Sequence, residues 1–209
     1  GMAYARKGNH DFTLQPSKAA EYYKLIATLA VEGHAPQAIY HLWSVTGSKP
    51  VDTGIKGATE LQTNGFFSLL YLAQAIGKED LSDPIRLGVI TDRLQRVAGE
   101  SGLVPAKATV LGPCRVIPQE FKNIRCVSID VDALPAAPRL QGAWLDRLIA
   151  DVTQSRGDEA VAYRATERWV QGYGALPLKP RDGKAAPALR DGGGYLLTGG
   201  LGGVGLALG

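Results

Sequence analysis

The sequence predicts an α/β fold with a doubly wound, mostly parallel sheet and helices on both faces. Two observations favour this class. Short apolar segments alternate with longer segments of helical periodicity, and strands that alternate with helices typically form a parallel sheet. The chain has 209 residues, of which 45% are apolar, so it can bury one sizeable core.

The first half of the chain predicts a helix with recognisable ends. Ser17 is the expected N-cap, and Gly33 occupies the position after the helix where a left-handed residue is favoured. Residues 38–45 carry large apolar side chains and few charges, as a mostly buried strand does. The other elements expected here are a short strand over 12–15, a helix over about 57–76 and a strand over Ile85–Thr91.

The second half predicts mainly strands, with one long helix. Pro113 can begin a short helix, which Pro118 limits because it lacks an N–H donor. Trp144, Leu148 and Val152 recur at four-residue steps, which indicates a helix over about 138–155. The remaining elements expected are a hairpin around 97–107 and strands over 107–111, 124–131, 160–164 and 168–173.

The glycine-dense stretch near the C-terminus is typical of the entry to a dinucleotide-binding unit. Tyr195–Leu197 predicts a short strand that ends at Thr198. Gly199 and Gly200 permit the positive φ of a tight turn, Gly203 leaves room for a pyrophosphate, and Gly205 lets a following helix pack closely. Such a unit also needs a second strand and a charged residue roughly 20 positions later. Because the sequence stops at Gly209, we expect an unfinished nicotinamide site.

Composition makes several classes of function improbable. The net charge of +3 arises from 23 basic and 20 acidic residues without a basic stripe, so nucleic-acid binding is not expected. No apolar run approaches the roughly 18 residues of a membrane span, and no signal peptide is visible. Cys114 and Cys126 have no metal or redox spacing, which favours reduced, structural cysteines in a cytoplasmic protein.

Candidate reactive residues are few. His41, Ser44 and Asp52 could suggest a nucleophile with its base, but residues three apart on a regular strand point to opposite faces. Asp130 and Asp132 fit a solvated strand end, and Trp43, Trp144 and Trp169 most simply fill the core. Three scattered histidines give no metal spacing, so no metal site is expected. The first strand–helix junction, at 14–17, contains no glycine that would let a phosphate approach the backbone.

Several of these segments together resemble the ketoreductase regions of modular type I polyketide synthases. The segments are Ile39–Ser44, Val110–Glu120, Arg125–Asp132, Val161–Arg164, Trp169–Gln171 and Tyr195–Gly205. The glycine loop alone fits any short-chain dehydrogenase, but its combination with the upstream segments is specific. The likeness covers essentially residues 10–209.

The resemblance implies a division of labour between two related halves. A truncated Rossmann-like structural subdomain supports a catalytic short-chain dehydrogenase subdomain, which reduces the β-ketone of a chain on an acyl carrier protein with NADPH. The family's Ser/Tyr/Lys catalytic set has no counterpart here, so no catalytic residue is expected. The loop residues expected to contact the cofactor in the intact enzyme are Thr198, Gly199, Gly200, Gly202, Gly203 and Gly205.

The sequence therefore predicts a non-catalytic structural subdomain over residues 1–176, a connector over 177–193 and the start of the catalytic NADP-binding subdomain over 194–209. Its expected partners are the catalytic subdomain in cis, acyl carrier protein and neighbouring synthase domains. Without the catalytic half, we expect neither bound cofactor nor reduction of a β-ketothioester. Two alternatives stay open: a module that docks carrier protein or synthase domains, and an independent enzyme built around His41.

Overall fold

The computed structural model describes residues 3–47, 49–132, 138–154, 157–177 and 190–208. The chain divides into two compact units, Gly1–Gly172 and Tyr173–Gly209. Most of the predicted connector, residues 178–189, lies outside the described residues.

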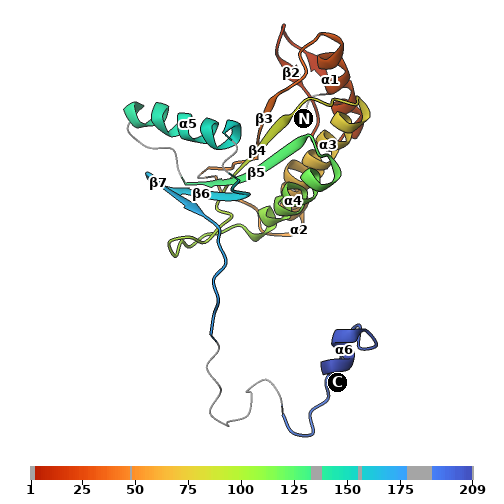
Figure 1. The fold of residues 1–209 in the computed structure, drawn as a ribbon, viewed down its shortest axis with the longest axis vertical. Helices are drawn as coiled ribbons and strands as arrows, with labels where there is room; N and C mark the ends of the chain where they lie inside the picture. The colour runs from red at the N-terminus through yellow and green to blue at the C-terminus, as the bar shows by residue number, and fades with distance from the viewer. Residues whose placement is uncertain (1–2, 48, 133–137, 155–156, 178–189, 209) are drawn as a thin grey trace. The chain divides into compact units, whose positions relative to one another are not determined.

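A five-stranded sheet forms the centre of the first unit (Figure 1). Its strands run in the order β3-β4-β5-β6-β7, in which the first four are parallel and β7 pairs antiparallel with β6. The strands are β3 (Ala38–Ser44), β4 (Ile85–Asp92), β5 (Ile124–Val131), β6 (Ala160–Arg164) and β7 (Glu167–Val170). The mostly parallel sheet is thus confirmed.

Helices cover both faces of this sheet, as predicted. Figure 1 shows α5 (Pro138–Thr153) on one face and α1 (Ala19–Val31), α3 (Ser68–Lys78) and α4 (Leu111–Glu120) on the other. The helix expected over 57–76 consists of α2 (Ile55–Gln62), a π-helical turn η1 (Thr63–Phe67) and α3. The strand expected over 12–15 is β2 (Phe12–Thr13), which pairs with β1 (Ala5–Arg6) in a separate two-stranded sheet.

Strand alternation divides the core into two layers. Ile85, Leu87 and Val89 of β4 pack with α1, α3 and α4 on one face. Trp144, Leu148 and Val152 of α5 pack with the opposite face of the strands, as their four-residue spacing predicts. On that face Gly88 of β4 brings α5 close, because a Cβ at this position would lie 2.3 Å from Val152 Cγ2.

The predicted hairpin around 97–107 and strand over 107–111 are wrong. Residues Pro105–Val110 form a 3₁₀ helix, η2, that continues into α4. Val104, Lys107 and Val110 are all buried, at the three-residue spacing that a 3₁₀ helix places on one side. The periodicity was hidden because a lysine normally marks an exposed position, and here it is only 1% exposed.

Other local expectations also need correction. The N-cap of α1 is Lys18, without a side-chain cap, rather than Ser17. Strand β3 lies at the edge of the sheet and is largely exposed, because β4 covers only one of its sides. Trp144 is buried, whereas Trp43 and Trp169 are 40% and 43% exposed.

The described residues of the second unit include one short helix, α6 (Gly203–Leu208), which follows a turn over 198–201. The strand predicted for Tyr195–Leu197 is not formed, since these residues have neither strand nor helix geometry. Within this unit, Tyr195, Leu196 and Leu197 are 52%, 92% and 42% exposed.

Candidate functional site

The carboxyl ends of β4 and β5 form the first place to look for a site. The chain leaving β4 goes to α4 on one face, and the chain leaving β5 goes to α5 on the other (Figure 1). Doubly wound sheets bind their ligands outside the carboxyl ends of strands at such a divergence. In this protein the two strand ends carry Asp92 and Asp130, both nearly or fully buried.

Asp92 is held by groups from two separate segments, η2 and the loop after β3. Lys107 Nζ donates to a carboxylate oxygen of Asp92, to its backbone oxygen at 3.0 Å and to Thr46 Oγ1 at 2.7 Å. The backbone N–H groups of Thr46 and Gly47 donate to the carboxylate at 3.0 and 2.7 Å. Burial would raise the pKa of Asp92, but the hydrogen bonds from Lys107, Thr46 and Gly47 outweigh burial and lower it. Burial lowers the pKa of Lys107, and its bond to Asp92 opposes that shift.

Asp130 is fully buried beside this cluster and anchors the loop after β4. Its carboxylate accepts hydrogen bonds from the N–H groups of Leu94 and Gln95 at 3.1 and 3.0 Å, and from Thr91 Oγ1 at 2.9 Å. Arg164 of β6 donates to it at 2.8 Å and also to Gln95 O at 2.6 Å. The expectation of a solvated strand end was therefore wrong for Asp130.

At the carboxyl edge of the sheet, the positions where a ligand would bind are filled by side chains and backbone groups of the protein itself. The carboxylates accept hydrogen bonds from backbone N–H groups, from the buried Lys107 and from Arg164, whose side chain is 11% exposed. Both carboxylates are thus already paired, which leaves this edge poorly suited to hold a phosphate or to move a proton, although Arg93 Nε is a buried donor beside Asp92 without a hydrogen-bond partner among the described residues.

The structure does not bring His41, Ser44 and Asp52 together. His41 Nε2 lies 2.7 Å from Ser68 Oγ of α3, and burial lowers the pKa of His41 to about 4. Asp52 instead accepts the N–H groups of Gly54 and Gly57 at the start of α2. His41 and Ser44 are nevertheless both buried, because the register with β4 shifts between them. The simple alternation used for the sequence missed this irregularity.

Two positions of the glycine loop require glycine because of the conformation of the loop itself. Gly199 adopts φ = +74°, and a Cβ on Gly205 would lie 2.5 Å from Gly199 O. Both positions therefore exclude larger residues on conformational or steric grounds. Gly203, the first residue of α6, has nothing within 4 Å of an added Cβ among the described residues.

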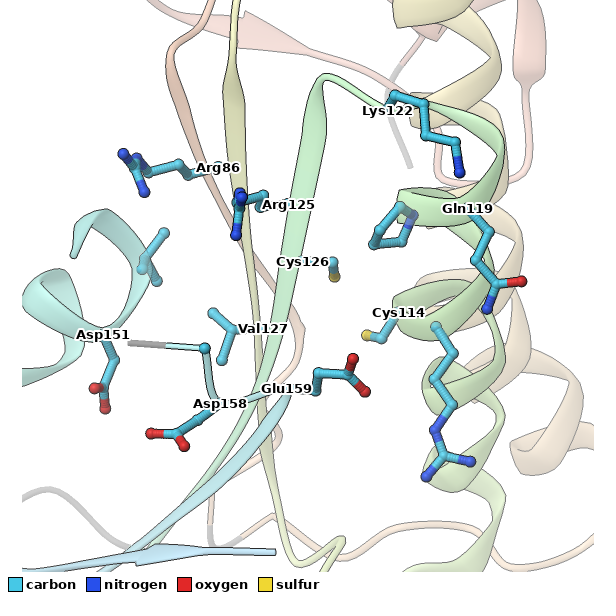
Figure 2. Close-up of a pocket in the computed structure, with 14 residues that line it drawn as sticks. Arg86, Cys114, Gln119, Lys122, Arg125, Cys126, Val127, Asp151, Asp158 and Glu159 are labelled. Carbon is cyan, nitrogen blue, oxygen red and sulfur yellow. The ribbon is translucent and has the colours of Figure 1, made fainter. Parts of the chain in front are cut away.

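A cavity of about 360 Å³ lies between α4 and the amino-terminal half of β5 (Figure 2). The thiols of Cys114 and Cys126 meet at its wall, and basic side chains of α4, β4 and β5 also line it. Nothing in the sequence indicated this pairing, because the two cysteines lie on different elements.

The model of the family described as "Beta-ketoacyl synthase-like, N-terminal" matches residues 1–142, more than half of the chain. The chain belongs to this family. Its curated relatives include large phenolphthiocerol/phthiocerol polyketide synthase proteins from Mycobacterium tuberculosis and from Mycobacterium bovis. Each is 31% identical over 130 residues, which cover 59% of this chain and 6% of the relative. The chain thus spans a small part of these long proteins.

Solved structures with a similar fold include ketoreductases. Structures of A-type ketoreductases from a modular polyketide synthase share 26% identity and a TM-score of 0.57, covering 92% of this chain and 38% of theirs. A multidomain structure with adenylation, ketoreductase and pseudo Asub parts from a keto acid-selecting NRPS module has a TM-score of 0.76 at 22% identity. The match covers all of this chain and 17% of the multidomain chain, and it supports the fold. The predicted relation to polyketide synthase ketoreductase regions is confirmed.

Two further observations concern the described residues alone. Every helix in those ranges is too short or too polar to cross a lipid bilayer. No three His, Cys, Asp or Glu side chains within the same ranges gather as a metal ion would require.

Proposed function

We propose that residues 1–176 are the non-catalytic structural subdomain of a polyketide synthase ketoreductase. In this proposal residues 177–193 connect it to residues 194–209, which begin the catalytic NADPH-binding subdomain. Its work is to support the catalytic half, which reduces β-ketoacyl chains on acyl carrier protein. The proposed partners are that half in cis, the carrier protein and neighbouring synthase domains.

The observation that carries the proposal is the carboxyl edge of the sheet. The position where a doubly wound fold binds its ligand holds two buried ion pairs, Asp92 with Lys107 and Asp130 with Arg164. A catalytic edge needs open donors and acceptors for its substrate, whereas this arrangement ties β4, β5 and β6 to the segments around them. Such ties suit a body whose role is to hold its shape.

The glycine loop supports a cofactor role for residues 194–209 in the intact enzyme. The proposed contact residues are Thr198, Gly199, Gly200, Gly202, Gly203 and Gly205. Gly199 and Gly205 are needed by the turn itself, but no described neighbour forbids a side chain at Gly203. Room at the start of a helix is what a pyrophosphate requires, so Gly203 is the position whose function lies outside the packing of this chain. When bound, NADPH would supply the hydride.

The test has two arms. The 209-residue protein is mixed with NADPH and a β-ketoacyl thioester, and oxidation is followed at the nicotinamide absorbance. We expect no turnover. The separately produced catalytic half of a related ketoreductase is then assayed with and without this chain, and we expect its activity or its thermal stability to rise. Turnover by the 209 residues alone, or no effect on the catalytic half, would contradict the structural role.

The loop is tested in a polypeptide that includes the catalytic half. Gly203→Ala should weaken NADPH binding at least tenfold, because its methyl group occupies the space of the pyrophosphate. Gly194→Ala is the matched control, since it also has nothing within 4 Å of an added Cβ but lies before the turn. Equal affinities for the two variants would remove Gly203 from the cofactor site. Carrier protein titrated against the 209 residues, followed by amide shifts, tests the docking alternative.

A further inference from the structure

Two cysteines twelve positions apart in the sequence meet in the fold. Cys114 lies on α4 and Cys126 on β5, and their sulfur atoms face one another across the space between helix and strand (Figure 2). Both are free thiols that hydrogen-bond to each other. The bond with Cys114, together with burial, raises the pKa of Cys126. Cys126 therefore keeps its proton more firmly than an ordinary thiol.

The pair lines a cavity at a point where the sheet is incomplete. Strand β6 pairs with β5 only from Ser128 onward, so the stretch Ile124–Val127 has no β6 neighbour. The cavity of about 360 Å³ lies along this open stretch, and both thiols line it. A small molecule that enters the cavity reaches two sulfurs at once.

The rim of the cavity carries an excess of available positive charge. Arg115, Lys122 and Arg125 line it and are exposed, and none forms an ion pair with a described residue. Two of the acidic groups on the opposite wall, Asp151 and Asp158, are bound by Arg168 at 3.0 and 2.7 Å. The cationic rim favours an anionic visitor.

We propose that this cavity is a thiol–disulfide exchange site for anionic low-molecular-weight disulfides, in which Cys114 and Cys126 close an internal disulfide between α4 and β5. The Cys114 thiolate attacks one sulfur of the small disulfide, a mixed disulfide forms, and one small thiolate leaves with the electron pair. Cys126 then gives its proton to the released thiolate, and its sulfur attacks Cys114 Sγ and expels the second small thiolate, which takes a proton from water. The two protein thiols are oxidised, and the small disulfide is reduced to two thiols.

The site is lined by none of the glycine-loop residues and lies away from the carboxyl edge of the sheet, so it stands independently of the structural role proposed above. Its chemistry would cross-link α4 to the stretch of β5 that has no β6 neighbour. The sequence could not suggest it, since the spacing of the cysteines matches no redox motif.

The reaction is tested on the reduced 209-residue protein with glutathione disulfide as the probe. Mass spectrometry should find one product, lighter by two hydrogen atoms and joined at Cys114 and Cys126. The Cys126→Ser variant should stop at a mixed disulfide on Cys114, because the resolving thiol is gone. Attachment of glutathione to both cysteines, or no reaction of either, would overturn the proposal. Circular dichroism of each variant shows that the fold is kept.

Charge selection is tested by a second measurement. The double variant Lys122→Gln, Arg125→Gln should react about tenfold more slowly with glutathione disulfide at low salt, and its rate with uncharged hydroxyethyl disulfide should not change. Lys56→Gln is the matched control, because Lys56 is also exposed but does not line the cavity. Equal rates for the double variant and the control with glutathione disulfide would refute the role of the cationic rim.

Discussion

Replacing Lys107 by methionine tests the ion pair that closes the carboxyl edge of the sheet. The ammonium group is 1% exposed and has three acceptors, namely a carboxylate oxygen and the backbone oxygen of Asp92, and Thr46 Oγ1. Methionine preserves most of the volume but none of these bonds, so the carboxylate of Asp92 stays buried without its cation.

The expected loss follows from what remains around Asp92. Removing one partner of a buried pair typically costs about 3–5 kcal/mol. The carboxylate keeps the N–H groups of Thr46 and Gly47, which places the expected destabilisation near the lower limit, about 3 kcal/mol. Asp92→Asn leaves a buried lysine with neutral acceptors only and should cost somewhat less, because that lysine can lose its proton.

The measurement is urea unfolding of the purified chain, followed by circular dichroism near neutral pH. The Asp92→Asn, Lys107→Met double variant should be more stable than the sum of the single losses by at least about 1 kcal/mol. Lys56→Met, an exposed control, should change stability by less than about 0.5 kcal/mol. Additive single losses, or a Lys107→Met cost no larger than the control's, would refute the view that this pair holds the edge together.

Two further predictions concern other buried positions. Burial lowers the folded-state pKa of His41 to about 4 from 6.5, so the unfolded chain binds the proton more tightly. The free energy of unfolding should therefore fall by about 3 kcal/mol as the pH drops from 6.5 to 4. The fall should be smaller in the His41→Gln variant. An NMR titration that gives His41 a pKa near 6.5 in the folded protein would contradict this prediction. Gly88→Ala should destabilise by about 1–3 kcal/mol in thermal unfolding, since its methyl group would lie 2.3 Å from Val152. Gly142→Ala in α5 has open space and should be neutral or stabilising, and equal effects would exclude the close approach as the cause.

The parallel sheet was predictable because each strand can be recognised from its own side chains. Ile85–Asp92 and Ile124–Val131 are rich in Ile, Leu and Val and largely buried on both faces, as strands covered by helices on both sides are. The helix α5 followed from Trp144, Leu148 and Val152 at four-residue spacing. In each case the burial of one element could be inferred from its own side chains.

The segment 97–111 could not be predicted on the same basis. Its buried helical turn depends on Lys107, whose burial is made possible by Asp92 fifteen positions earlier in the chain. A single sequence does not reveal that pairing, so the lysine suggests a solvent-exposed position. The meeting of Cys114 with Cys126 was invisible for the same reason.

Asp130 and His41 add a second physical limit. A strand-end aspartate usually faces water, and only the approach of Arg164 and of the N–H groups of Leu94 and Gln95 makes its burial favourable. For His41, alternation failed where the register of β3 shifts, and nothing in the residues from His41 to Ser44 marks that shift. The candidate sites thus depended on long-range contacts, whereas the fold class depended on local pattern.

The contrast between the two ends of the sheet strengthens the proposed division of labour. At the carboxyl end, which catalytic α/β proteins leave open, buried pairs satisfy the polar groups and fix the loop after β4. At the amino-terminal half of β5 the sheet is open and lined by two thiols and by cations that form no ion pair with a described residue. If this sheet had a catalytic role, the unpaired polar groups would be needed at its carboxyl end. Both thiols and these cations therefore lie away from the edge where this fold performs catalysis, as expected if the sheet serves as a support.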